Sequence, residues 1–93
     1  MKYIVMQRMI GSMVREVPIL FPNELVHQHV ASALLKLPGN PYKFLNKVSA
    51  AGDVDLDAVV CSGRSTTLRI DSRGKEDADL ILTVEYGGGV KPL

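Results

Sequence analysis

The sequence predicts an α+β domain in which an antiparallel sheet of about four strands packs against one main helix. Two observations support this prediction. Two strand-like segments flank a turn near the start, and a helix-like segment separates them from later strand-like segments. This order favours an antiparallel sheet over parallel βαβ units. Ninety-three residues suffice for one core, so we expect a single domain over residues 1–86 and a flexible tail over 87–93.

The first two strands are expected at residues 2–10 and 14–21, joined by a turn at Gly11 and Ser12. Both segments are rich in β-branched, aromatic and long apolar side chains, which favour strands. Pro18, in the second segment, has no backbone N–H to offer a neighbouring strand. The second strand is therefore expected at an edge of the sheet, or with a bulge at this residue.

The main helix is expected over residues 23–37. Asn23 is a suitable N-cap, and Pro38 followed by Gly39 ends the helical pattern. Leu35 is expected to point away from the apolar face, so a second layer or a partner must cover it. At about 100° per residue, the positions that share the apolar face are Val26, Val30, Ala33, Leu34 and Leu37.

The second half of the chain is expected to complete the sheet and to add a short helix. Strands are predicted at residues 47–56 and 58–63, and Gly52 indicates a bulge or bend in the first of them. Residues 65–70 suit either a fifth short strand or a loop. A second short helix is predicted near residues 75–83.

Residues 80–86 suit a helix and a strand equally well, so both alternatives stay open. Apolar residues on the inner faces of all these elements should form the core. The predicted core residues are Ile4, Val5, Ile19, Phe21, Val26, Val30, Leu34, Val48, Leu56, Val60 and Ile81.

Composition excludes several classes of protein. The net charge is +1, so no overall charge draws the chain to nucleic acid or to an anionic membrane. No apolar run approaches the roughly 18–20 residues that span a bilayer, and no targeting or lipidation signal is present. A single cysteine excludes an internal disulfide and a cysteine-rich zinc site. These features predict a cytoplasmic protein with no membrane partner.

The charge is unevenly distributed along the chain. Residues 1–50 carry six basic and two acidic residues, and residues 51–93 carry five basic and eight acidic residues. The halves therefore have net charges of +4 and −3, which suits docking of two identical chains. Pro18 at a free edge and Leu35 outside the apolar face add surfaces for self-association. A two-fold homodimer is predicted, and ordinary variation of charge along a monomer is the alternative.

The alternating Asp53, Asp55 and Asp57 have the spacing of the first ligands of a calcium loop. Such a loop also needs glycine at its sixth position and a bidentate glutamate at its twelfth. Here these positions hold Ala58 and Arg64. The aspartates are therefore interpreted as the solvated face of a strand.

No group of residues has the spacing of a catalytic or metal site. His27 and His29 are two apart, which places them on different sides of a helix, and His29 is expected to be half-buried beside the apolar face. Cys61 lies in an apolar segment without an identifiable base, as a buried structural cysteine does. The sequence therefore predicts no enzyme, no metal and no cofactor.

A polar segment after the fourth predicted strand has the chemistry of an anion site. Its hydroxyls, a flexible backbone and a positive charge could together hold a phosphate or a carboxylate. The alternative is an ordinary polar strand and turn. The residues of this candidate anion site are Ser62, Gly63, Arg64, Ser65 and Thr66.

A basic segment follows, which could contact nucleic-acid phosphates through Arg64, Arg69, Arg73 and Lys75. Acidic residues follow it at once, however, and no aromatic side chains are interleaved to stack on bases. Helix ion pairs such as Lys75 with Asp79 explain part of the pattern without a ligand. Nucleic-acid binding is therefore kept as the alternative function.

Three blocks of the sequence together resemble a group of short, uncharacterised proteins of bacteriophage and prophage genomes. The blocks are residues 18–22 with the helical residues 26–31, residues 47–52, and residues 61–65 continuing through 72–81. The resemblance implies a compact α+β domain and a phage or prophage context, so the cytoplasm predicted above would be that of a bacterial host. It implies no activity, cofactor or catalytic residue.

These observations together predict a non-enzymatic protein-interaction module whose partner the sequence does not identify. In the phage or prophage context, such a module would be a minor assembly component or a small inhibitor of a host system. The small size of the chain, the lack of a catalytic pattern and the resemblance favour this function over nucleic-acid binding.

Overall fold

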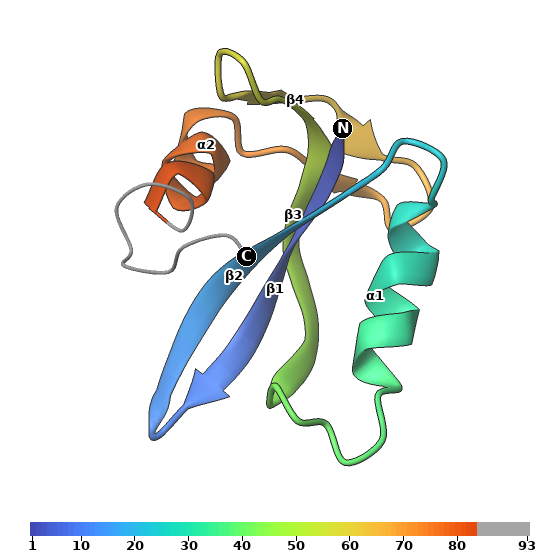
Figure 1. Cartoon of the computed structure of the whole chain (residues 1–93), viewed down its shortest axis with the longest axis vertical. Coiled ribbons are helices and arrows are strands. Elements are labelled where there is room, and N and C mark those ends of the chain that lie inside the picture. The colour runs from blue at the N-terminus through green and yellow to red at the C-terminus, as the bar shows by residue number, and fades with distance from the viewer. Residues whose placement is uncertain (84–93) are drawn as a thin grey trace.

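The computed structural model describes residues 1–83, which form a four-stranded antiparallel sheet with a helix on each face (Figure 1). The predicted α+β class is confirmed. The tail expected at 87–93, and the question of helix or strand over 84–86, lie outside the described residues. In chain order the elements are β1 (Lys2–Ile10), β2 (Met13–Phe21), α1 (His27–Leu35), β3 (Phe44–Asp55), β4 (Val60–Ser62), β5 (Arg64–Ser65), β6 (Ile70–Asp71) and α2 (Lys75–Leu82).

The sheet has the strand order β2-β1-β3-β4, and β5 pairs with β6 in a separate small hairpin. β1 and β2 pair without a break from Lys2 opposite Phe21 to Ile10 opposite Met13. β2 is an edge strand, as Pro18 predicted. β1 therefore pairs with both of the other long strands, β2 and β3. Its first and last residues lie towards opposite ends of the molecule (Figure 1).

β3 is longer than predicted and curls along β1. The register of the β1–β3 pair shifts twice. Val5 pairs with Ala50 but the next residue of β1 pairs with Val48, and a second shift lies between Val48 and Phe44. The irregularities thus lie before Gly52, not at the glycine as expected. Gly52 instead permits close packing, because an added Cβ would overlap the carbonyl oxygen of Ser62 and lie 3.0 Å from Ser72 Cβ.

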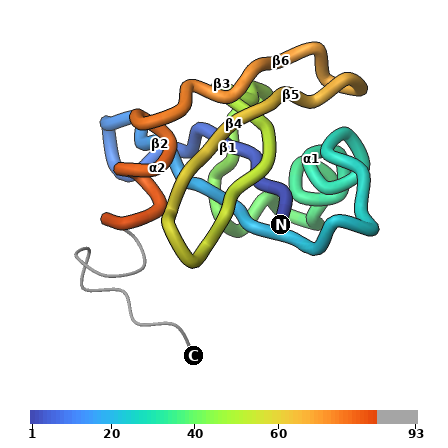
Figure 2. Tube along the Cα trace, turned by 90° about the horizontal axis from the view of Figure 1, so that it is seen from above, coloured from blue at the N-terminus to red at the C-terminus, as the bar shows by residue number. Residues whose placement is uncertain are grey.

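The two faces of the sheet have separate apolar clusters, and the views in Figures 1 and 2 place α1 and α2 on opposite sides of it. The β5–β6 hairpin crosses one end of the sheet. The buried residues of the cluster under α2 are Tyr3, Val5, Ala50, Val54, Cys61, Ala78 and Ile81. Those of the cluster under α1 are Ile4, Met6, Phe21, Ala31, Phe44 and Ala51.

α1 begins at His27, four residues later than predicted. The backbone of Leu25 bonds back to Pro22, so the chain first makes a turn, and Asn23 is not the cap. Val26 holds the cap position and has no side-chain cap hydrogen bond. The helix ends at Leu35 instead of residue 37, shortly before Pro38 and Gly39.

The inner face of α1 is also rotated from the expected one. His27 and Ala31 are its buried residues, whereas Ala33 and His29 are exposed. Leu35 is half-buried and packs against the cluster under α1, so the expectation that it points away from the core is wrong. His27 replaces His29 as the core histidine because it shares the inner face with Ala31, four residues further along the helix.

α2 at Lys75–Leu82 agrees with the short helix predicted near residues 75–83. Two residues that were predicted in the core, both near β4, are exposed instead. Leu56 is 42% exposed in the β3–β4 turn, and Val60 is 54% exposed on the short β4. β4 directs Cys61 inward, so alternation directs its neighbour Val60 outward. No helix within residues 1–83 combines the length and apolar character that crossing a membrane requires.

Candidate functional site

A buried polar network ties the first strand to the last described helix. Asp77 of α2 is fully buried, and its carboxylate accepts hydrogen bonds from the Tyr3 hydroxyl at 2.5 Å and from Arg73 Nε at 2.7 Å. The Arg73 guanidinium also lies 2.9 Å from the carboxylates of Glu16 and Glu76. One arginine is thus paired with three carboxylates, which fastens α2 to β1 and β2.

The protonation of this network suits a structural role. Burial, together with the hydrogen bond to Asp77, raises the pKa of Tyr3 far above its ordinary value. Burial also raises the pKa of the nearby Cys61 thiol, and a protonated thiol is a poor nucleophile. The buried His27 packs on Phe21, in the cluster on the other face of the sheet. The structure therefore keeps its buried histidine away from the thiol.

The hydroxyls of the candidate anion site lie in different environments. Ser62 ends β4, and Thr66 lies exposed in the β5–β6 turn. Ser65 is fully buried, and its Oγ accepts a hydrogen bond from the Leu68 backbone at 3.1 Å within that turn. The buried hydroxyl thus stabilises the β5–β6 turn.

Carboxylates lie beside the remaining two members of the candidate anion site. Arg64 Nε lies 3.5 Å from the carboxylate of Asp71 on β6. A Cβ added to Gly63 would lie 3.0 Å from a carboxylate oxygen of Asp53. These negative charges oppose the approach of a phosphate or a carboxylate to this segment.

The basic segment expected to contact nucleic acid is mostly paired with acids of the same chain. Arg69 lies in the β5–β6 turn, and it is the member that has no ion pair within the described residues. The pairs of the others are Arg73 with Glu16, Glu76 and Asp77, Arg64 with Asp71, and Lys75 with Asp79. Phosphates would have to compete with these carboxylates.

Pro18 and Leu35 were expected to mediate self-association, yet both pack within the folded chain. Pro18 is buried in β2, opposite Val5, and Leu35 packs under α1. A proline in an edge strand also removes a donor that an added strand would need. Neither residue therefore supplies the exposed apolar surface that the predicted two-fold interface requires.

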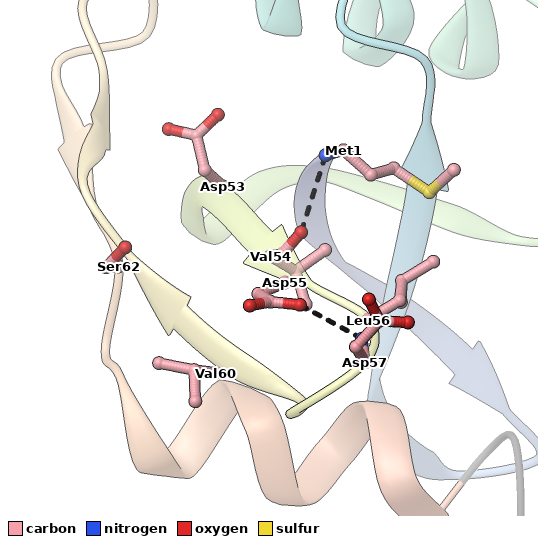
Figure 3. Close-up of a pocket in the computed structure, with 8 residues that line it drawn as sticks. All are labelled: Met1, Asp53, Val54, Asp55, Leu56, Asp57, Val60 and Ser62. Carbon is pink, nitrogen blue, oxygen red and sulfur yellow. Dashed lines mark hydrogen bonds between the residues drawn. The ribbon is translucent and has the colours of Figure 1, made fainter.

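An open pocket lies where β1 begins, and Figure 3 shows its lining side chains. Its volume is about 710 Å³. We call it the acidic pocket because three aspartates line it, together with the exposed Leu56 and Val60. The lining residues are Met1, Asp53, Val54, Asp55, Leu56, Asp57, Val60 and Ser62.

The three aspartates do not converge on one point. Asp55 accepts a hydrogen bond from the Asp57 backbone at 3.0 Å and so closes the β3–β4 turn, while the Asp53 side chain points away from both in Figure 3. Within residues 1–83, no three His, Cys, Asp or Glu side chains are grouped as metal ligands. The acidic pocket thus combines apolar side chains with separate carboxylates in its lining, which suits apolar and basic side chains of a partner.

The opposite end of β1 bears a second group of exposed apolar residues. The β1–β2 hairpin projects beyond the rest of the fold (Figure 1), and we call residues 8–15 the hairpin tip. Ile10, Met13 and Val14 are all at least half exposed there. Burial of such side chains against a partner is favourable by about 25 cal/mol per Å².

Two arginines face each other just behind these apolar residues. Arg8 on β1 lies directly opposite Arg15 on β2, and like charges in this position destabilise a strand pair. Neither arginine has an ion pair within residues 1–83, and Arg8 Nε is buried without a hydrogen-bond partner there. Carboxylates from a partner would relieve this repulsion.

The neighbouring segments make this whole end of the molecule basic. The α1–β3 connection passes beside the hairpin, since the Met9 backbone N–H bonds to the Lys43 carbonyl at 3.0 Å. Lys36 and Lys47 flank that connection, and residues 25–52 contain no acidic residue. The uneven charge of the sequence thus becomes a separation of charge in space.

Sequence reasoning missed the hairpin tip, although a signal was present. The residues Ile10 and Met13 flank the Gly11–Ser12 turn symmetrically, and Arg8 and Arg15 lie two further positions out on each side. In a two-residue hairpin this symmetry places each pair face to face. The alternating aspartates were interpreted only as the solvated face of a strand. The pocket that they line also needs Met1 and residues of β4, and the alternation of residues along one strand does not show where those residues lie.

Comparisons of the chain with protein-family models, with curated proteins and with solved structures found no match to any of the three. The functional argument therefore depends on the surfaces of the molecule itself.

Proposed function

We propose that this protein is a non-enzymatic protein-interaction module that binds through the hairpin tip. The exposed Ile10, Met13 and Val14 on a projecting hairpin, beside two arginines without acidic partners among the described residues, are the observation that carries this proposal. The resemblance to small phage and prophage proteins suggests a minor assembly component or a small inhibitor of a host system, in the bacterial cytoplasm.

The chemistry of the tip favours a protein partner. Apolar side chains gain by burial in a protein interface, and arginine is enriched at the centre of such interfaces. Hairpin residues are also held in place by the sheet, so binding orders few new groups. The basic segment at 64–75 is mostly paired with carboxylates, which supports the alternative of nucleic-acid binding less well.

Retention of proteins on immobilised chain tests the proposal. The bait is the wild type, a Met13→Asp/Val14→Asp variant, or a Leu25→Asp control, in which an exposed leucine outside the hairpin receives the same charge. Each bait is incubated with bacterial lysate, with and without nuclease treatment, and separately with untagged copies of the chain. We expect the wild type and the control to retain a protein that the hairpin variant does not retain.

Two outcomes would contradict the proposal. The first is that the wild type retains neither a lysate protein nor its own copies. The second is a ligand that disappears on nuclease treatment and depends on Arg69 instead of the tip, which would favour nucleic-acid binding. Circular dichroism of each variant establishes that a lost partner does not reflect a lost fold.

A further inference from the structure

We infer that the partner of the hairpin tip is a second copy of this chain, whose acidic pocket receives it. The inference rests on the proposed function and names its partner. Self-association would then be head to tail, with the hairpin tip of one copy in the pocket of the next. This differs from the two-fold dimer that the sequence suggested, because two different surfaces meet.

The two surfaces cannot meet within one molecule. The acidic pocket contains Met1, which precedes β1, and the hairpin tip includes Ile10, which ends it. A strand of this length spans roughly 30 Å at about 3.3 Å per residue. The longest extent of the molecule is 35 Å, so the two surfaces lie at its opposite ends.

The surfaces match in chemistry. On one face of the hairpin, the pair Ile10 and Met13 lies next to the turn, and the pair Arg8 and Arg15 lies two positions further from it. The end of the hairpin on this face is therefore apolar, and the cations lie behind it. The acidic pocket offers partners for both kinds of side chain, because the exposed apolar Leu56 and Val60 and three exposed aspartates are among its lining residues (Figure 3). Insertion of the tip would bury its apolar pair against Leu56 and Val60 and bring the arginines close to the aspartates.

The carboxylates of the acidic pocket can pair with the arginines of the hairpin tip. The repulsion between Arg8 and Arg15 falls when Asp53 and Asp57 approach them, and arginine with carboxylate is the strongest common charged pair. Asp57 has no ion pair within the described residues, so it can accept an arginine without losing another partner. The two charge sets are thus complementary in sign, and Arg15, Asp53 and Asp57 are exposed.

A contact between two different surfaces leaves one of each surface free in every dimer. Such heterologous contacts continue until they close a ring or extend as a filament. The hairpin tip is small, so the interface belongs to the weak class of less than about 1,200 Å². Association should therefore depend on concentration and proceed beyond the dimer.

Sedimentation equilibrium over about a hundredfold range of concentration tests the inference. We expect the wild-type mass to rise past that of a dimer, and Arg15→Glu and Asp57→Lys each to lower the association constant at least about tenfold. The double variant Arg15→Glu/Asp57→Lys reverses both charges and should regain most of the association. The matched controls Arg69→Glu and Glu24→Lys change charge equally outside both surfaces and should associate like the wild type.

Several results would overturn the inference. A wild type that stays monomeric throughout excludes self-association, and a lysate protein whose capture Met13→Asp/Val14→Asp abolishes would then leave the proposed function standing. A mass that saturates at the dimer indicates a two-fold interface. Failure of the double variant to recover, while it keeps the native circular dichroism, shows that these charges do not meet. Binding of an oligonucleotide through Arg15, without self-association, assigns the basic end to nucleic acid.

Discussion

At the scale of single residues, a few closely packed positions hold this small fold together. Gly52 allows the chain around Ser62 and Ser72 to cross β3 at backbone distance, and its carbonyl oxygen lies 2.9 Å from His27 Nε2. One residue thus contacts both the crossing segment and the start of α1.

Gly52→Ala should destabilise the protein by about 2–3 kcal/mol, because the new methyl group overlaps a backbone carbonyl that cannot rotate away. The midpoint of urea unfolding measures this change. The control is Gly11→Asn, since an added side chain there meets nothing within 4 Å and asparagine tolerates the left-handed backbone (φ +61°). Equal midpoints for the two variants would contradict the close packing at Gly52.

Asp77→Asn should destabilise the protein by about 1.5–3 kcal/mol, because Arg73 and Tyr3 lose a charged hydrogen-bond acceptor while Arg73 keeps Glu16 and Glu76. The same unfolding measurement applies. Asp79→Asn on the same helix removes a carboxylate that is largely exposed, so it should change the midpoint little. If both variants unfold at the same urea concentration, the network contributes no more than a surface ion pair.

Tyr3 should make the protein lose stability in alkaline solution. Its pKa is raised in the folded chain, so above the ordinary tyrosine pKa of about 10 the unfolded chain releases a proton that the folded chain keeps. Its contribution is therefore complete below about pH 10 and falls by up to about 1.4 kcal/mol for each further pH unit.

Unfolding free energies at pH 9, 10 and 11 for the wild type, Tyr3→Phe and the exposed-residue control Tyr42→Phe measure this effect. Tyr3→Phe is less stable at pH 9 because it lacks the hydrogen bond to Asp77, but it should lose less stability than the wild type as the pH rises. Parallel curves for all three proteins would show that the buried hydroxyl ionises as it does in the unfolded chain.

At the scale of elements, periodicity predicted which segments form and failed where tertiary contacts decide. The β1–β2 hairpin and α2 were placed to within a residue because their patterns are local. The start of α1 was misplaced because Asn23 has the side chain of a cap, yet Pro22 and Leu25 close a turn instead. The pocket could not be predicted, since it joins Met1 to the β3–β4 turn across the sheet.

The late start of α1 leaves a helix without a side-chain cap, which suggests a stabilising change. Val26→Thr keeps the shape of the half-buried side chain and adds an oxygen that can accept a hydrogen bond from the first helical turn. We expect a gain of about 0.5–1 kcal/mol in thermal or urea unfolding. Val26→Ala is the control and should destabilise, and a threonine variant no more stable than alanine would contradict this cap position.

At the scale of the whole molecule, the separation of basic and acidic ends should make self-association sensitive to salt. The exposed charges of the acidic pocket and of the hairpin tip are screened beyond about 10 Å at 0.1 M ionic strength and beyond about 3 Å at 1 M. The average mass at fixed concentration should therefore fall as sodium chloride rises over this range. A mass that rises with salt would indicate that apolar contacts, and not the arginines and aspartates, determine the association.

The hydrogen bond between Tyr3 and Asp77 joins residues 74 positions apart. Because a ribosome synthesises the chain from its N-terminus, β1 is made first. One of its faces stays uncovered until α2, the last described element, has been made. Until then, Tyr3 and Val5 lack the buried surroundings that Ala78 and Ile81 supply. A chain interrupted before residue 75 would thus keep an open apolar sheet face, and quality-control proteases and chaperones recognise such surfaces.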